Sequence, residues 1–265
     1  MKRPKDTNRN KNSGKNEIRR PIGGPESAPA NSEPFFPMRI NKYLAWKKQS
    51  TRRGADELIE KKQVFINGRP AVLGDKVNET DKIEVRFRGK PKPYIYIAYN
   101  KPRGIVTHSA EPGQKDISQV VAVKDVFPIG RLDRDSSGLI ILTNDGRITD
   151  SLLNPNSHHE KEYLVTTKEK LRSSFKAKME SGVRIEDEMT RPAKVEIVNE
   201  NKFRIILTEG KSHQIRRMCA ALFQEVDTLT RVRIMNIQLG KMPAGAHRVI
   251  EGDELKEFLG ALGIK

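Results

Sequence analysis

The chain has 265 residues, of which 50 are Lys or Arg and 34 are Asp or Glu, so its formal net charge is +16 at pH 7. This length is enough for one large domain or for two smaller domains, each with a hydrophobic core. No apolar run approaches the roughly 18 residues that a membrane span requires. The single cysteine, Cys219, excludes an intramolecular disulfide and a cysteine-rich zinc cluster and favours a reducing cytoplasm, while the excess positive charge indicates nucleic acid ahead of an acidic membrane as partner.

Residues 1–37 have the composition of a disordered basic tail. They hold eight basic and four acidic residues among Pro, Gly, Ser and Asn, with almost nothing to bury before Phe35 and Phe36. Because this tail carries only about a quarter of the net charge, the remainder of the chain is strongly basic as well.

Residues 38–88 predict a small unit of two helices and short strands. Apolar residues at i, i+3 and i+4 spacing over 40–44 and 55–59 predict two short amphipathic helices. A strand at 64–66 is expected to turn at Asn67-Gly68, where both residues tolerate positive φ, into a return strand at 71–72. Alternation of apolar and charged residues from 83 to 88 predicts a further strand with one wet face.

Residues 89–93, Gly-Lys-Pro-Lys-Pro, predict a linker, after which a second domain is expected over 94–265. Its predicted strands lie at 94–99, 139–142, 163–166, 195–198, 203–207 and 231–239. Its predicted helices lie at 171–179, at 213–223 and from 253 to the end. Strands and helices alternate without a fixed period, which indicates the α+β class.

A polar stretch just before the apolar strand at 139–142 puts Asp133 on a loop at a sheet edge, where a substrate could reach it. One interpretation is a calcium loop, because Asp133, Asp135, Ser137 and Gly138 match the first, third, fifth and sixth positions of an EF-hand. The twelfth position, which needs a bidentate Glu, is Asn144.

A second interpretation pairs Asp133 with Asp135 as in a glycosidase, but nothing in the sequence fixes the distance between the two carboxylates. A third makes Asp133 a nucleophile held by neighbouring arginines, with Arg131 and Arg134 as local candidates. An Asp side chain titrates near about 3.9, and an ionised carboxylate can attack carbon. A loop aspartate that only caps a turn fits the spacing equally well.

Residues 210–212, Gly-Lys-Ser, lie where a strand gives way to a helix. A P-loop needs glycine five residues before this triplet, where the chain has Ile205, so a nucleotide-binding loop is excluded. Lys211 beside a helix N-terminus remains a candidate phosphate site. Gln214 and Arg216 project from the flanks of that helix, toward a cleft or toward solvent.

Residues 158–160, His-His-Glu, resemble metal ligands, but adjacent histidines point apart on a strand and no second ligand cluster accompanies them. Tyr163 fits an ordinary strand aromatic or a platform for a flipped base.

Four stretches occur in one order along the chain: Met38-Arg39-Ile40-Asn41-Lys42-Tyr43-Leu44 with the Asn67-Gly68 turn, Gly130-Arg131-Leu132-Asp133, Lys161-Glu162-Tyr163-Leu164-Val165, and His213-Gln214-Ile215-Arg216-Arg217-Met218. Together they resemble the pseudouridine synthases that modify ribosomal RNA and carry a small N-terminal S4 domain. The resemblance implies an S4 RNA-binding domain at 38–88. It also implies a catalytic domain at 94–265, built on a mixed, mainly antiparallel sheet with flanking helices.

The resemblance also implies roles for individual residues. Asp133 matches the catalytic aspartate, Tyr163 the active-site tyrosine and Arg216 the basic residue that pairs with the aspartate. The residues expected to bind substrate or RNA are Arg131, Lys211, Gln214 and Ile215 in the catalytic domain and Arg39, Lys42, Arg52 and Arg53 in the S4 domain.

The expected function is the isomerisation of one uridine of 23S ribosomal RNA to pseudouridine, with transfer RNA as an open second substrate. The resemblance implies that no cofactor or metal is required. From the cysteine usage and the composition we expect a cytoplasmic protein without a membrane partner, and we also expect a monomer. A non-catalytic S4 protein that binds RNA or assists ribosome assembly is the alternative, and it predicts that Asp133→Asn leaves cellular function intact. A calcium-dependent binder is a third hypothesis.

Overall fold

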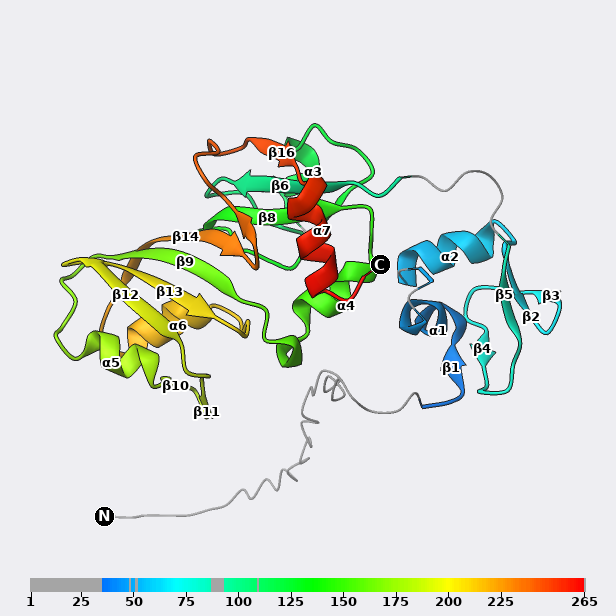
Figure 1. Cartoon of the computed structure of the whole chain (residues 1–265), viewed down its shortest axis with the longest axis horizontal. Coiled ribbons are helices and arrows are strands. Elements are labelled where there is room, and N and C mark those ends of the chain that lie inside the picture. Colours follow the sequence, from blue (N-terminus) through cyan, green and yellow to red (C-terminus); the bar gives the residue numbers. More distant parts are fainter. Residues whose placement is uncertain (1–34, 48, 51, 87–92, 109, 265) are drawn as a thin grey trace, which may run out of the picture. The chain divides into compact units, whose positions relative to one another are not determined.

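The computed structural model describes residues 35–264, apart from 48, 51, 87–92, 109 and the side chain of Arg53. The predicted tail at 1–37 and the predicted linker at 89–93 therefore lie almost entirely outside the described residues. Within the described part, no helix has both the length and the apolar character needed to cross a membrane. Figure 1 shows the helices and strands of an S4-like portion, residues 35–86, and of a C-terminal portion, residues 93–264.

The first portion contains two helices and five short strands: β1 (Met38–Arg39), α1 (Ile40–Trp46), α2 (Arg52–Glu60), β2 (Val64–Ile66), β3 (Arg69–Pro70), β4 (Lys76–Val77) and β5 (Ile83–Val85). β1 pairs with β4, and β2 lies between β3 and β5 with antiparallel pairing throughout. Asn67 and Gly68 have φ of 50° and 83°, as a two-residue hairpin turn requires. Because this turn pairs Ile66 directly with Arg69, the return strand begins two residues before the predicted position.

Helices α1 and α2 bury the faces that their spacing predicts. Ile40 and Leu44 on α1 and Ala55 and Ile59 on α2 belong to one core cluster with the strand residues beneath them. Asn41 Nδ2 donates a hydrogen bond to Asp56 Oδ1 at 2.9 Å and links the two helices. The amphipathic pattern thus gives this small unit a core of its own.

The C-terminal portion is built on a nine-stranded sheet with the order β12-β13-β9-β14-β8-β6-β16, to which β15 adds through β14 and β7 through β8. The strands are β6 (Tyr96–Lys101), β7 (Phe127–Ile129), β8 (Ser137–Thr143), β9 (Lys161–Thr167), β12 (Lys194–Asn199), β13 (Lys202–Leu207), β14 (Val226–Ile234), β15 (Ile237–Gln238) and β16 (His247–Val249). All pairs are antiparallel except a short parallel contact between β8 and β14. The predicted α+β class with a mixed, mainly antiparallel sheet is confirmed.

Helices and a small hairpin flank this sheet: α3 (Ile117–Val120), α4 (Arg147–Leu153), the 3-10 turn η1 (Pro155–Ser157), α5 (Phe175–Glu180), β10 (Arg184–Ile185), β11 (Glu188–Met189), α6 (Gln214–Ala221) and α7 (Gly252–Ala261). Helix α5 begins later than predicted because Leu171 N donates to Glu200 O at 2.7 Å, away from the helix. The strand predicted at 231–239 is divided, because Met235 adopts a φ of 52° and β15 folds back on β14.

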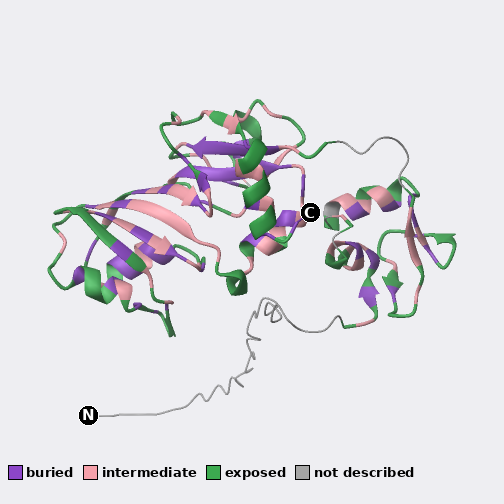
Figure 2. Ribbon diagram, in the orientation of Figure 1, coloured by how far each residue is buried: buried purple, intermediate pink, exposed green. Residues whose placement is uncertain are grey.

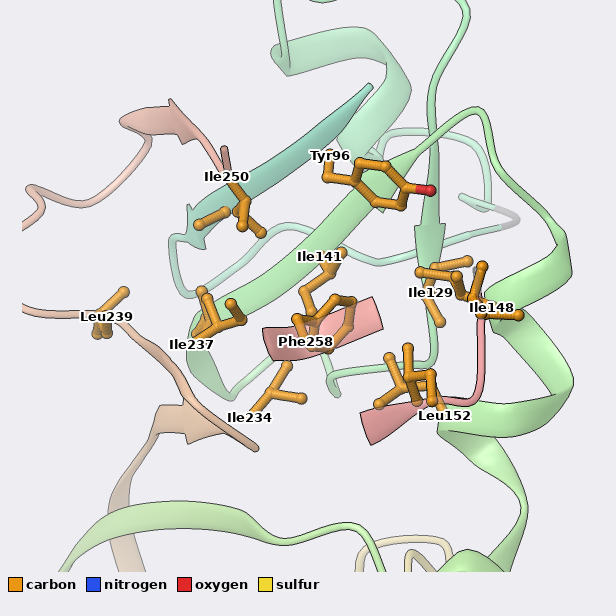
Figure 3. Close-up of a cluster of buried hydrophobic side chains, with 14 residues drawn as sticks. Tyr96, Ile129, Ile141, Ile148, Leu152, Ile234, Ile237, Leu239, Ile250 and Phe258 are labelled. Atoms are coloured by element: carbon orange, nitrogen blue, oxygen red, sulfur yellow. The ribbon is translucent and has the colours of Figure 1, made fainter. Parts of the chain in front are cut away.

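Three core clusters of the described residues pack against the sheet, and the third joins Ile117 and Leu132 to side chains of β6 and β8. In the first, Phe258 of α7 lies among Ile141, Ile234 and Ile237 (Figure 3). In the second, α5 and α6 cover β9, β13 and β12. Figure 2 shows β6 and β8 buried over most of their length, so the strand after Asp133 is part of the buried interior.

The two halves meet where β8 crosses β14. Gly138 has a φ of 105°, and a Cβ on it would lie 2.3 Å from the carbonyl oxygen of Arg231, so only glycine fits this contact. Next to it, the hydroxyls of Ser137 and Thr230 share a hydrogen bond of 3.0 Å. The chain that leaves the Asp133 loop is therefore fixed directly against β14.

A buried ion pair between Asp145 and Arg147 lies at the opposite end of β6 and β8. The Asp145 carboxylate has no exposed surface and accepts hydrogen bonds from Tyr96 Oη at 2.5 Å and from Arg147 Nε at 2.9 Å and Nη2 at 2.8 Å. Burial by itself would raise the pKa of Asp145, but the hydrogen bonds from Arg147 and Tyr96 outweigh burial and hold the pKa below its usual range.

Removal of this carboxylate by Asp145→Ala should lower the free energy of unfolding by about 3–5 kcal/mol, because it leaves the Arg147 guanidinium partly buried without its partner. Urea denaturation at neutral pH measures the change, and Asp150→Ala on the exposed face of α4 is the control, with an expected loss below about 1 kcal/mol. In the wild type, the contribution of Asp145 is present above the ordinary Asp pKa of about 3.9 and is lost as the pH falls through the lower folded-state pKa. Equal losses in the two variants would contradict this account.

Candidate active site

A cavity of about 390 Å³ opens where the loop before β8, the strands β9 and β14 and the loop before α6 meet. Six of the predicted site residues line it: Arg131, Asp133, Tyr163, Lys211, Gln214 and Ile215. They come from three separate stretches of the chain. The structure therefore brings the three sequence motifs of the C-terminal portion together at one place.

Asp133 stands at the start of a tight turn that is anchored on both sides. Before it, Leu132 is buried, and its N–H and C=O are both hydrogen-bonded to the Thr107 hydroxyl, at 3.0 and 2.7 Å. After it, Ser136 N donates to Asp133 O at 3.0 Å, and Gly138 then enters the contact with β14. The Asp133 side chain, 34% exposed, is left at the wall of the cavity.

The partner of the Asp133 carboxylate is a histidine. His213 Nδ1 lies 3.2 Å from Asp133 Oδ2, and a proton on Nδ1 makes this a hydrogen bond. His213 is the residue before α6 and has a φ of 49°, so the left-handed backbone at the helix start aims its ring at the carboxylate. Sequence reasoning did not single out His213, although it begins the His-Gln-Ile-Arg stretch.

Arg216 holds the turn rather than the carboxylate. Its Nη2 donates to Asp135 O at 3.1 Å and its Nη1 to Val226 O at 3.4 Å. With both nitrogens directed at carbonyl oxygens, the expected ion pair with Asp133 is not present among the described residues. Arg216 in this structure positions the backbone two residues beyond Asp133.

Arg231 is a second guanidinium at the site, and the sequence motifs did not assign it a role. It is 4% exposed, and it donates from Nε to Leu139 O at 2.7 Å and from Nη1 to Arg131 O at 3.5 Å. It thereby fastens the chain before and after Asp133 to β14. Its place two residues after the buried Leu229 on an alternating strand is the signal that could have identified it.

Burial also lowers the pKa of two lysines of the C-terminal portion. Lys101 has no exposed surface, and its Nζ donates to Ile105 O at 2.6 Å and to Pro102 O at 3.1 Å. Burial lowers the pKa of Lys101 to about 8, and the charge of Asp133 partly opposes this shift. Burial, with a smaller effect of the Arg231 charge, lowers the pKa of Lys161 to about 8 as well.

The loop before α6 uses some of its predicted ligands internally. Lys211 Nζ forms an ion pair with Glu188. Gln214 is 4% exposed, donates to Glu209 Oε1 at 2.6 Å and accepts from Lys211 N at 3.0 Å. Both side chains line the cavity, but their polar atoms are bonded to neighbouring protein groups.

The remaining predicted cations are exposed. Arg131 lies at the mouth of the cavity, and Arg39, Lys42 and Arg52 lie on the S4-like portion. None of these four forms an ion pair with another described residue. Arg53 belongs to α2, but its side chain lies outside the described part of the structure.

The calcium interpretation does not fit the local geometry. Residues 137–143 continue as strand β8, and Asn144, at the twelfth position, accepts a hydrogen bond from Ile95 N at 2.8 Å. Within the described ranges, no three His, Cys, Asp or Glu side chains are grouped so that they could hold a metal. His158 Nδ1 instead lies 3.3 Å from Arg191 Nη1.

Comparison with known proteins matches both portions of the chain. A family model described as RNA pseudouridylate synthase covers residues 95–221, and the S4 domain model covers residues 38–83. The dual-specificity RNA pseudouridine synthase RluF of Escherichia coli (strain K12) is 41% identical over 228 residues, which are 84% of this chain and 78% of that protein.

Two further comparisons agree. The ribosomal large subunit pseudouridine synthase B of Bacillus subtilis (strain 168) is 32% identical over 231 residues, which are 83% of this chain and 95% of the relative. A crystal structure of a pseudouridylate synthase superposes with a TM-score of 0.62 at 29% identity and covers 85% of this chain and 99% of its own. The match to RluF agrees with a resemblance to the large-subunit synthase F in particular, which residues 159–165 and 231–236 carry. The chain belongs to the RNA pseudouridine synthases, of the RluF type with an N-terminal S4 domain.

Proposed function

We propose that this enzyme converts a uridine of 23S ribosomal RNA to pseudouridine, with Asp133 as the nucleophile. The observation that carries the proposal is the position of Asp133, on an anchored turn at the wall of a cavity that Tyr163 and Ile215 also line. The cavity volume of about 390 Å³ is in the range of small-ligand sites. The names of the relatives, one a large-subunit enzyme and one dual-specific, support large-subunit RNA as substrate and a second RNA, such as transfer RNA, beside it.

The reaction is an isomerisation without net redox change, and its chemistry calls for a positioned carboxylate. The bond between ribose C1′ and uracil N1 breaks, the base turns, and C5 forms the new bond to C1′. C5 loses a proton, and N1 gains one. In this proposal, contacts with the backbone on either side of Asp133 hold its carboxylate in position for attack. Thr107 bonds to Leu132, and Arg231 bonds to the carbonyl oxygens of Arg131 and Leu139. Arg216 bonds to the carbonyl oxygen of Asp135.

The base must first leave its stack in the RNA, at a cost of a few kcal/mol. Tyr163 and the apolar Ile215 in the cavity wall offer a surface for the flipped uracil, and stacking on an aromatic ring contributes about 1–3 kcal/mol. Arg131 at the mouth can bind a flanking phosphate. We further propose that the enzyme acts as a monomer in the cytoplasm, where it meets its RNA substrate.

Release of tritium from RNA labelled at uridine C5 tests the proposal, because C5 loses its hydrogen only when the carbon–carbon bond forms. Wild-type protein should release tritium from 23S RNA fragments and leave pseudouridine at the labelled site. Binding of the RNA without any release would instead favour the non-catalytic RNA-binding protein.

RNA binding by the S4 portion should quench the fluorescence of Trp46, the only tryptophan of the chain. Trp46 is 47% exposed, its ring lies 5.9 Å from that of Tyr43, and Lys47 Nζ lies 4.4 Å from its centroid. Lys42, one helical turn before it, is exposed and can bind phosphate. Because a stacked base contributes about 1–3 kcal/mol, Trp46→Ala should weaken RNA binding by roughly 5- to 150-fold.

The matched control is Phe223→Ala, which removes an exposed aromatic ring from the C-terminal portion and should leave RNA affinity unchanged. Unaltered Trp46 emission at saturating RNA, together with wild-type affinity of Trp46→Ala, would show that RNA does not contact this helix.

A further inference from the structure

Four cations line the active-site cavity: Arg131, Lys161, Lys211 and Arg231. Arg231 donates from Nε and Nη1 to two backbone carbonyls, and its buried Nη2 has no partner among the described residues. Lys211 is neutralised by Glu188. Arg131 is exposed at the mouth. Lys161 is a partly buried lysine of the lining, and it forms no ion pair with a described residue.

Lys161 stands in an apolar setting on β9. Its cross-strand neighbours are Leu207 on β13 and Ile234 on β14, which are both buried. Tyr163 follows two residues later, so its side chain lies on the same face of the strand. A cation flanked in this way interacts strongly with any anion that enters the cavity, because little water screens it.

The ammonium group of Lys161 also has N–H donors available for a ligand. Its hydrogen bond in the structure is a long one, 3.4 Å from Nζ to His159 O. No carboxylate of the described residues forms an ion pair with it. An ammonium group carries three N–H donors, so at least one remains for a ligand in the cavity.

We propose that Lys161 is a catalytic residue whose ammonium group stabilises the uracil anion that forms when the glycosidic bond breaks. The inference rests on the proposed function. The C1′–N1 bond breaks as Asp133 bonds to C1′, and the electron pair of the broken bond stays on N1, from where its charge spreads to the two uracil carbonyl oxygens. Lys161 donates a hydrogen bond to this anion and keeps its proton. When C5 bonds to C1′, the electron pair of the ester bond returns to the Asp133 carboxylate. C5 then loses its proton to water, and N1 takes up a proton from water.

The stabilised charge exists on the departing base and not on neutral uridine, so Lys161 acts on the rate rather than on binding. This distinguishes it from Arg231 and Arg216, which act through the backbone and are positioning residues. It also fits the apolar setting, because the charge of Lys161 is costly in the empty site and is compensated when the anion appears.

The test compares uridine with 5-fluorouridine at the target position in single-turnover reactions. Fluorine withdraws electrons and makes the uracil a better leaving group, which needs less help from a cation. Lys161→Met should lower the rate of uridine consumption by about 10²- to 10³-fold, as loss of one charge-stabilising donor does, and the rate of 5-fluorouridine consumption by clearly less. Lys161→Arg should restore part of the uridine rate, and RNA affinity should stay at the wild-type value in both variants.

Lys194→Met is the matched control, because Lys194 is exposed on β12 and pairs with Glu160 outside the cavity. It should leave both rates unchanged. An equal loss for uridine and 5-fluorouridine in Lys161→Met would assign Lys161 a structural role, and no loss would remove it from the mechanism. Either outcome overturns the inference while the proposed function stands, whereas a wild type that forms no pseudouridine refutes the proposed function itself.

The pH dependence gives a second readout. Because the pKa of Lys161 is lowered to about 8, the ammonium form dominates below this pH, and the wild-type rate should fall as the pH rises through it. Besides Tyr163, the titratable or charged groups that line the cavity are Arg131, Asp133, Glu209, Lys211, His213 and Arg231. His159 lies outside the lining, and burial, together with the charge of Lys161, lowers its pKa. The pKa of Lys101, which does not line the cavity, is also lowered to about 8. The decrease in rate is therefore assigned to Lys161 by two results: it should be absent in Lys161→Met, and it should move to higher pH in Lys161→Arg. A decrease that persists unchanged in Lys161→Met would contradict the assignment.

Discussion

Asp133→Asn should reduce pseudouridine formation on the order of 10⁴- to 10⁶-fold, the scale on which removal of a nucleophile acts. The amide keeps the shape of the carboxylate, and its oxygen can still accept the hydrogen bond from His213 Nδ1. It lacks the negative charge that attacks carbon, so binding survives while the chemistry stops. Tritium release from labelled RNA measures the reaction, and filter binding measures the affinity.

Asp135→Asn is the control for that experiment. Asp135 lies two residues further along the same loop, its side chain is exposed, and its contact with Arg216 is made by the backbone carbonyl, which the substitution leaves in place. We expect activity close to that of the wild type. Substantial activity of the Asp133→Asn protein, or equal losses in both variants, would remove Asp133 from the role of nucleophile.

Gly138→Ala should destabilise the fold and abolish activity together. A Cβ at this position would lie 2.3 Å from Arg231 O and 2.7 Å from Arg231 N, so β8 would have to move away from β14. The clash and the unfavourable φ of 105° should together lower the free energy of unfolding by at least about 2 kcal/mol. Because the Asp133 turn ends at this glycine, any displacement also moves the nucleophile. Urea denaturation and tritium release measure the two effects.

Gly113→Ala separates the clash from the backbone strain. Gly113 has a similar φ of 85°, but no atom lies within 4 Å of the position that a Cβ would occupy. This variant should lose only the part of the stability that comes from the backbone conformation and should keep its activity. If Gly138→Ala were as stable and as active as Gly113→Ala, the tight contact between β8 and β14 would not be what positions the site.

The local patterns predicted much of the secondary structure. The strand predicted at 203–207 became β13, the apolar run at 139–142 became the middle of β8, and the Asn67-Gly68 turn has the positive φ angles it was expected to have. These features depend on near neighbours in the chain. The division of the strand at 231–239 was not predicted, because a turn at Met235 depends on how β15 folds back on β14 rather than on a Gly or Pro signal.

The site was predictable in its components and not in its contacts. Asp133, Tyr163 and Ile215 stand in recognisable motifs, and the cavity brings them together. Which cation reaches the carboxylate depends on distances of a few ångströms between separate segments. Here His213 makes that contact, and Arg216 reaches a carbonyl oxygen instead.

Arg231 and Lys161 illustrate what sequence alone cannot supply. Each is an unremarkable basic residue of a strand until the sheet order is known. The pairing of β14 with β8 and β9 puts Arg231 beneath the Asp133 turn and Lys161 between two buried aliphatic side chains. Burial, which the sequence does not report directly, is what gives both side chains a role.

The central claim is most directly tested by mapping pseudouridines in 23S ribosomal RNA from cells that lack the gene. We expect at least one pseudouridine to disappear from the map, to return when the wild-type gene is restored, and to stay absent when the restored gene carries Asp133→Asn. A map that is unchanged by loss of the gene, or one that the Asp133→Asn gene restores in full, would contradict the account.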